Sequence, residues 1–255
     1  MSDTKEIATT FRPPVSEVLA VAEGYDRSDT RGKEGITSED LRLPFLAIAQ
    51  KTSKALDATE GVYIEGLKFL DLYNSETRQV YGPGPLRFIP LLHRKRAHLR
   101  ASNGLLEREV LDWNDPRVTW EGAREAKLDK PEGVRIYDWV VLLMPTFELV
   151  VISFMSKSFG AGQSLTTFVQ MRPGPAFSGQ YAIKSVSDEN DSGKFGKFHV
   201  VPAGKPAPEE AEFAASVYET IKGKKLVVDD PEGAAADEGV ATERATDGVR
   251  DPVSF

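Results

Sequence analysis

Basic side chains are concentrated in residues 87–100, a stretch near the middle of the chain that contains no acid. Its basic and histidine positions are Arg87, His93, Arg94, Lys95, Arg96, His98 and Arg100. Such a strip attracts nucleic-acid phosphates, and each neutralised phosphate releases counterions, so that affinity falls as salt rises. A solvated strand face would have the same composition, because short basic runs are common. The apolar residues 88–92 predict a buried strand that continues into the basic strip.

Aromatic residues interleave with charged ones in the segment that follows. The candidates for base stacking are Trp113, Trp120, Tyr137 and Trp139, with Lys157 further along the chain. Exposed rings can stack on bases at about 1–3 kcal/mol each, while lysine and arginine follow the backbone without reading sequence. Any one of these rings could instead lie in the core, because large rings bury large apolar areas. A nucleic-acid site therefore requires that cations and rings share one accessible face.

A second group of basic and aromatic residues flanks the polar turn at residues 188–193. Its members are Tyr181, Lys184, Lys194, Phe195 and Lys197. Because strand side chains alternate, Phe195 and Lys197 should share one face of a hairpin, with Lys194, Gly196 and Phe198 on the other. One of the two faces could hold DNA while the other packs inward. An ordinary hairpin with solvated lysines is the alternative, and the acids of the turn argue against phosphate contact at the tip itself.

The net charge of −7 is distributed unevenly along the chain. Residues 226–255 carry eight acids and two bases, residues 1–40 carry nine acids and five bases, and the interior is therefore left with +3. A basic body between acidic ends is compatible with a polyanionic partner, whereas a uniformly acidic protein would not be.

The acidic C-terminal segment ends in Arg-Asp-Pro-Val-Ser-Phe, with Asp247, Asp251 and Phe255 as candidate partner-binding residues. This arrangement resembles the tails of bacterial and phage single-stranded DNA-binding proteins, and the layout that begins with Leu-Pro-Phe-Leu-Ala-Ile-Ala-Gln at 43–50 is similar to phage early proteins of this class. The resemblance implies that the tail recruits replication and recombination proteins, and its acids could compete with DNA for the basic groove. A purely solubilising tail is the alternative, because acidic runs are common.

Short β-favouring segments separated by Gly and Pro turns predict a mainly β protein with a few helices, of the α+β class. We expect strands within 62–73, 86–98, 136–144 and 148–159, a hairpin around 188–193, and helices at 163–171 and 209–222. An OB-like β-barrel with elaborations is the expected architecture, partly by functional analogy. The expected organisation is a mobile N-terminal arm at 1–40, one domain at 41–225 and a disordered acidic tail at 226–255.

The usual signatures of enzymes and metal sites are missing from the sequence. There is no cysteine, and no HExxH, nucleophile-elbow or phosphate-loop motif occurs, so we expect no catalytic step, no cofactor and no bound metal. The absence of cysteine and of a long apolar run predicts a cytoplasmic protein without a membrane segment, located in the bacterial host if a phage encodes it. An enzyme that binds magnesium through Asp112, Asp115 or Asp138 is the least favoured alternative.

The function predicted from the sequence is sequence-tolerant binding of single-stranded DNA in phage replication or recombination. The expected partners are single-stranded DNA, replication and recombination proteins that contact the tail, and further copies of the chain. A structural or assembly protein of a virus is the main alternative, because a β-rich body with polar ends would serve equally well there.

Overall fold

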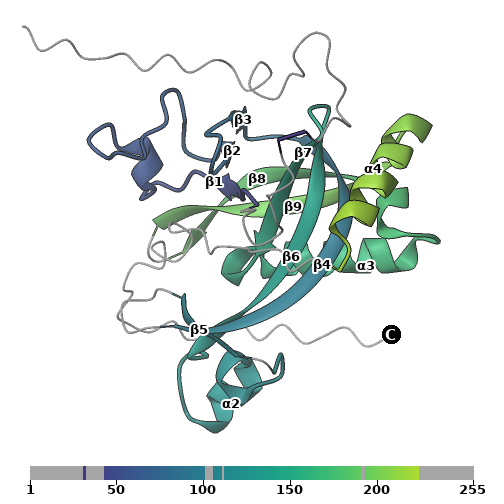
Figure 1. Cartoon of the computed structure of the whole chain (residues 1–255). Coiled ribbons are helices and arrows are strands. Elements are labelled where there is room, and N and C mark those ends of the chain that lie inside the picture. Colours follow the sequence, from purple (N-terminus) through teal and green to yellow (C-terminus); the bar gives the residue numbers. More distant parts are fainter. Residues whose placement is uncertain (1–30, 33–42, 101–105, 111, 191–192, 224–255) are drawn as a thin grey trace, which may run out of the picture.

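The computed structural model describes residues 31–32, 43–100, 106–110, 112–190 and 193–223, and only the backbone of 106–110. Within these residues the chain forms two antiparallel sheets and three α-helices (Figure 1). The small sheet contains β1 (Leu46–Ile48), β2 (Leu72–Asn74) and β3 (Val80–Gly82). The large sheet contains β4 (Leu86–Arg100), β5 (Leu106–Val110), β6 (Gly133–Met144), β7 (Glu148–Phe154), β8 (Gln180–Asn190) and β9 (Gly193–Gly204). The helices are α2 (Trp120–Glu125), α3 (Phe159–Met171) and α4 (Pro208–Ile221), and short 3-10 turns are η1 (Lys54–Leu56), η2 (Pro116–Val118), η3 (Ser156–Ser158) and η4 (Ala176–Ser178).

The large sheet is built around the long strand β4. Its strand order is β7-β6-β4-β8-β9, and β5 also pairs with β4. Strand β6 pairs with β4 from Arg87 to Leu99, whereas β8 pairs only with the first residues of β4 and β5 only with the last. In Figure 1, β5 and α2 lie at the C-terminal end of β4, and the small sheet lies away from them.

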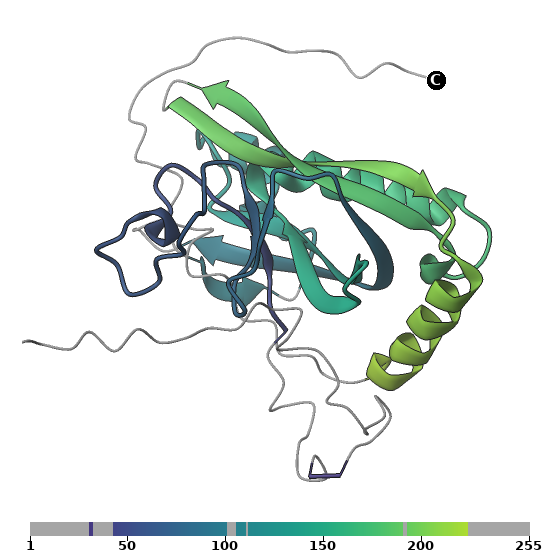
Figure 2. The same cartoon turned by 90° about the horizontal axis from the view of Figure 1, so that it is seen from above.

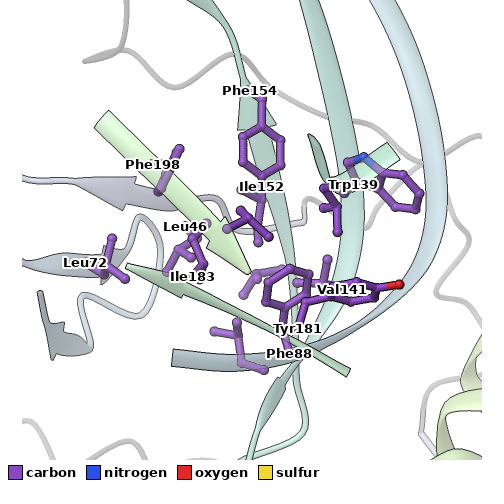
Figure 3. Packing of buried hydrophobic residues seen from close by; sticks show 14 of the residues in the cluster. Leu46, Leu72, Phe88, Trp139, Val141, Ile152, Phe154, Tyr181, Ile183 and Phe198 are labelled. Atoms are coloured by element: carbon purple, nitrogen blue, oxygen red, sulfur yellow. The ribbon is translucent and has the colours of Figure 1, made fainter. Parts of the chain in front are cut away.

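Strand β6 is buried on both faces because the large sheet is covered on both sides. Its odd positions from Tyr137 to Leu143 belong to the larger core cluster, together with Phe88, Phe154, Tyr181 and residues of α3. Figure 3 shows this cluster, in which Leu46 and Leu72 of the small sheet meet Ile183 and Phe198. A strand buried on both faces is expected to be nearly continuously apolar, as the Val- and Leu-rich sequence of β6 is.

The even positions of β6 pack into a second core cluster on the opposite face. Val140, Leu142 and Met144 lie there with Ile89 and Leu91 of β4. Helix α4 covers this cluster with Ala214 and Ile221, and the segment before β1 adds Leu43 and Phe45. Figure 2 shows α4 at the end of the molecule opposite the small sheet and η1.

The two outer strands of the large sheet are both contacted by the segment 44–50. At β7, the Val151 amide donates to the Pro44 carbonyl at 2.8 Å, which forms an isolated parallel bridge. At β9, the Gln50 side chain donates to the Gly196 carbonyl at 2.9 Å and accepts from the Gly196 amide at 2.7 Å. One bridge and one side-chain clamp do not make a continuous ladder, so the described strands form no closed barrel, and the expected OB-like barrel is not confirmed.

The free edge of β9 is covered at further points along the strand. The Ser158 hydroxyl accepts from the Phe198 amide at 3.0 Å, two residues beyond the Gly196 clamp. Pro202 lies on the same side of the strand and has no amide hydrogen to offer.

The predicted helix at 209–222 and the hairpin around 188–193 are confirmed as α4 and as β8–β9. The predicted strand at 62–73 is wrong for most of its length: only Leu72–Asn74 is a strand, and the preceding residues form turns. Tyr63 in this segment is exposed, whereas Ile64 and Leu67 pack into a small cluster of their own. The predicted terminal segments, 1–40 and 226–255, lie almost entirely outside the described residues. In the part of the chain that is described, no helix is long and apolar enough to cross a membrane.

Candidate nucleic-acid interface

The register between β4 and β6 brings basic and aromatic side chains onto one face of the large sheet. His93 lies opposite Trp139, and Lys95 lies opposite Tyr137. The His93 ring stacks on Trp139 at 4.6 Å and on Tyr137 at 5.5 Å between ring centroids. Alternation along β4 therefore sends His93 and Lys95 to this face and Arg94 and Arg96 to the other.

Two further rings extend this face beyond the strands. Trp113 lies 5.1 Å from Tyr137 and 6.2 Å from Phe159 between centroids, and Tyr137 and Phe159 are 4.9 Å apart. Trp113 precedes η2, and Phe159 is the first residue of α3. Both rings are partly buried, so each keeps some accessible surface next to the sheet. Aromatic rings in contact with one another form a rigid platform.

Cations lie over these rings. The Lys95 Nζ atom is 5.4 Å from the Trp113 centroid and 5.9 Å from that of Tyr137, and the Arg135 guanidinium carbon is 5.3 Å from the Trp113 centroid. Arg135 Nε also donates to the Trp113 carbonyl at 2.9 Å. We call this group the cation–ring face; its residues are His93, Lys95, Trp113, Arg135, Tyr137 and Phe159.

A smaller pair of the same kind lies beside it, where the Lys157 Nζ atom is 5.6 Å from the Phe195 centroid. Among the described residues, no carboxylate forms an ion pair with Lys95, Arg135 or Lys157. The charges of Lys95 and Arg135 are consequently available to an anionic ligand, whereas the charge of Lys157 also helps to lower the pKa of Asp188.

The electrostatics of the face also act on His93. Partial burial lowers the pKa of its imidazole, the neighbouring ammonium of Lys95 lowers it further, and Asp138 opposes them. The ring is therefore mainly neutral near pH 7, and an anion bound beside it would favour protonation.

The other face of β4 holds a buried polar network rather than a basic surface. Arg96 is 4% exposed, and its Nε donates to Asp138 Oδ2 at 2.5 Å. Arg96 Nη1 lies 3.1 Å from His98 Nε2, and the Ser153 hydroxyl donates to Asp138 Oδ1 at 2.6 Å. The sequence prediction that placed Arg96 and His98 on an accessible strip is thus corrected: the register with Asp138 draws Arg96 inside, where its charge is paired.

The remaining basic residues of the run 87–100 are dispersed. Arg87 is exposed and donates to Gln180 Oε1 at 3.4 Å, and Arg94 is exposed on the face opposite Lys95. Arg100 donates to the Ser156 hydroxyl at 2.9 Å. The run is therefore divided between two faces, and only His93 and Lys95 reach the cation–ring face.

Three of the rings expected to be stacking platforms are largely buried. Trp139 is 3% exposed, Tyr181 is 1% exposed and Tyr137 is 9% exposed, because all three belong to the larger core cluster. Trp139 and Tyr181 cannot offer a face to a base in this conformation. Tyr137 is also buried, and it contributes to the cation–ring face by packing against Trp113 and Phe159. Trp120, on α2, is 61% exposed and makes no ring contact with the described part of the cation–ring face.

The lysines of the β8–β9 hairpin have different surroundings. Lys184 and Lys194 are exposed, the latter opposite Glu189. Lys197 forms an ion pair with Asp188 at 2.5 Å, and hydrogen bonds from Lys197 and the Glu189 amide lower the pKa of this carboxyl. Phe195 is partly buried under Lys157. Asp247, Asp251 and Phe255 lie outside the described residues.

The acids considered for magnesium binding are each engaged in other contacts. Asp138 pairs with Arg96, Asp112 accepts from the Asn114 amide, and Asp115 accepts from both the side chain and the amide of Arg117. Hydrogen bonds from Arg117 lower the pKa of Asp115 to about 2. Within the described chain, no group of three or more histidine, aspartate or glutamate side chains could hold a metal ion.

The sequence prediction missed Arg135 as a site residue. The sequence feature that could have identified it is the alternation of Arg135, Tyr137 and Trp139 along one strand. The predicted strand began at residue 136 and therefore did not include Arg135. His93 and Phe159 could be identified as basic and aromatic residues, but their place beside Trp113 depends on the pairing of β4 with β6.

Comparison with known protein families identifies the chain as a bacteriophage protein. It belongs to the family described as Pam3 phage gp34-like protein, which it matches over residues 15–99 and 137–227, more than half of its length. No curated protein and no solved structure matches the chain. The two matched segments include Lys95, Tyr137 and Phe159, whereas Trp113 and Arg135 lie between them.

Proposed function

We propose that this phage protein binds single-stranded DNA without strong sequence preference, in replication or recombination, and performs no catalytic step. The observation that carries the proposal is the cation–ring face, where Lys95 and Arg135 lie over Trp113 and form no ion pair with a carboxylate of the described residues. Proteins that bind single strands combine cations that follow the backbone with rings on which bases stack. The family membership supports a phage role and is compatible with this function.

A single strand suits the face better than a duplex does. The rings are flat and contribute no aligned set of hydrogen-bond donors for base edges, and a duplex keeps its base faces stacked inside. Because the large sheet is open in its described part, we propose binding along a sheet face rather than in the groove of a closed barrel. Lys157 and Phe195 would extend the DNA-binding surface from the cation–ring face toward β9.

The test is fluorescence anisotropy of a labelled oligothymidylate across a salt series, with unlabelled duplex as competitor. We expect binding that weakens with salt and resists the duplex. The double variant Lys95→Ala/Arg135→Ala should bind more weakly, and the slope of log K against log salt should fall by about 0.7 for each lost phosphate contact. Lys54→Ala, at an exposed position on η1, is the matched control and should behave like the wild type.

Two results would reject the proposal. One is no binding of the oligonucleotide by the wild-type chain at low salt, and the other is equal competition by duplex. Formation of regular particles without any response to oligonucleotides would instead support the structural or assembly role.

A further inference from the structure

Trp113 contacts four of the other five residues of the cation–ring face, as Tyr137 does, and it is the ring over which both Lys95 and Arg135 lie. The Lys95 ammonium and the Arg135 guanidinium both lie over its ring, at 5.4 and 5.3 Å from the centroid. Tyr137 and Phe159 pack against the same indole. These four neighbours cover part of the ring, so Trp113 could contribute to binding through the residues that it holds in place as well as through stacking.

Trp113 also fixes Arg135 through its own backbone. Its carbonyl accepts from Arg135 Nε at 2.9 Å, and the next residue, Asn114, accepts from Arg135 Nη2 at 3.3 Å through Oδ1. These bonds occupy one edge of the guanidinium and leave its remaining N–H groups for another acceptor. Lys95, by contrast, has a flexible stem and no ion pair with a described acid, so the ring contacts are what restrain its ammonium.

The source of these residues in the chain is informative. Lys95, Tyr137 and Phe159 belong to the segments that match the family, whereas Trp113 and Arg135 come from residues 100–136 between them. The family pattern thus provides the sheet face and one cation. The intervening segment adds the second cation together with the ring that both cations share.

We propose that Trp113 is a positioning residue of the DNA-binding face: it holds Lys95 and Arg135 against one ring, so that the two cations contact the phosphates of one strand together. This inference rests on the proposed function. Two cations held in a fixed arrangement lose less side-chain entropy on binding than two free ones, which is the advantage that the ring provides. In this scheme, residues 100–136 adjust the affinity of a platform that the rest of the family pattern supplies.

A double-mutant cycle separates positioning from direct stacking. We expect Trp113→Leu to weaken binding of the oligothymidylate about tenfold and to lower the salt slope, because both cations lose their fixed arrangement. Adding Trp113→Leu to Lys95→Ala/Arg135→Ala should then cause almost no further loss. Trp113→Phe, which keeps a ring, should remain within about threefold of the wild type. Tyr63→Leu, which removes an exposed ring of the η1–β2 segment, is the matched control.

A measurement on the free protein makes the inference testable without DNA. In nuclear magnetic resonance spectra, the side-chain methylene protons of Lys95 and Arg135 should show upfield ring-current shifts. In Trp113→Leu the shifts of Arg135 should disappear and those of Lys95 should fall to what Tyr137 contributes, whereas Tyr63→Leu should leave both unchanged. Absence of these shifts in the wild type would overturn the inference. So would losses from Trp113→Leu and Lys95→Ala/Arg135→Ala that simply add, since additivity indicates direct contact between Trp113 and DNA. A wild-type chain that does not bind DNA rejects the proposed function instead.

Discussion

Lys95 and Arg96 are neighbours in the sequence, but their side chains lie on opposite faces of β4. Lys95 remains exposed beside Trp113, whereas Arg96 is buried with Asp138. A buried guanidinium is tolerated only when its charge is paired, and the carboxylate is itself fixed by the Ser153 hydroxyl. At the scale of single residues, one step along a strand therefore separates a potential phosphate contact from a structural ion pair.

The ionisation of His93 predicts, also at the scale of a single residue, how the stability of the protein depends on pH. Burial and the neighbouring Lys95 hold the pKa of His93 below its usual value of 6.5 in the folded state. Protonation therefore favours the unfolded chain: the stabilisation from neutral His93 is complete above pH 6.5 and is lost as the pH falls from there through the folded pKa.

We expect the free energy of unfolding to fall less in His93→Gln than in the wild type between about pH 7.5 and about pH 5.5. Denaturant titration at several pH values measures this free energy of unfolding. His199→Gln, at an exposed position of β9, is the control and should follow the wild type. Identical pH profiles for His93→Gln and the wild type would show that burial and Lys95 do not lower the pKa of this imidazole.

At the scale of elements, the segment 44–50 connects parts of the large sheet that are far apart in its strand order. It bridges β7 through Pro44 and clamps β9 through Gln50. There is little space beside Gly196, the β9 residue that Gln50 contacts. A β-carbon at this position would approach Ile48 Cγ2 to 2.7 Å and Leu70 Cδ2 to 3.0 Å. Glycine at this position allows the small sheet to approach β9 closely enough for the clamp to form.

Gln50→Ala should destabilise the protein by about 1–3 kcal/mol, because the backbone amide and the backbone carbonyl of Gly196 both lose their partner where the small sheet meets β9. Gln50→Glu should also destabilise the protein, because the carboxylate still accepts from the Gly196 amide but places a second acceptor against the Gly196 carbonyl. Chemical denaturation gives the energies, and hydrogen exchange at the Gly196 amide reports the clamp directly. Unchanged stability and exchange in Gln50→Ala would show that water replaces the side chain at no cost.

Elements with a strong local signal were predictable from the sequence, and contacts between distant elements were not. Helix α4 has acids in its first turn and apolar residues at helical spacing, and the β8–β9 hairpin has a polar turn between two apolar runs. The segment 62–73 has β-favouring residues but forms turns, because Ile64 and Leu67 find their contacts in a local cluster. Similarly, composition identified a basic run, but only the pairing of β4 with β6 determines which of its residues lie beside Trp113.

At the scale of the whole molecule, the terminal segments of the sequence carry a net negative charge and the body carries a net positive charge. We propose that the tail, with Asp247, Asp251 and Phe255, recruits replication or recombination proteins and that its acids compete with DNA for the cation–ring face.

Removal of residues 226–255 should then tighten binding of the oligothymidylate and steepen its salt dependence, because an internal competitor is lost. Anisotropy titrations of the full-length and shortened chains compare the two directly. A chain in which the eight tail acids are replaced by their amides should behave like the shortened one. Equal affinity of all three chains would indicate a tail that only solubilises.

The covered edge of β9 limits how copies of this protein could associate with one another. Gln50 and Ser158 already occupy backbone groups at Gly196 and Phe198, and Pro202 has none to donate. Growth of one sheet from copy to copy would need those groups free. Copies that associate would therefore not do so by extending the ladder of β9, and contacts at this edge would have to use side chains.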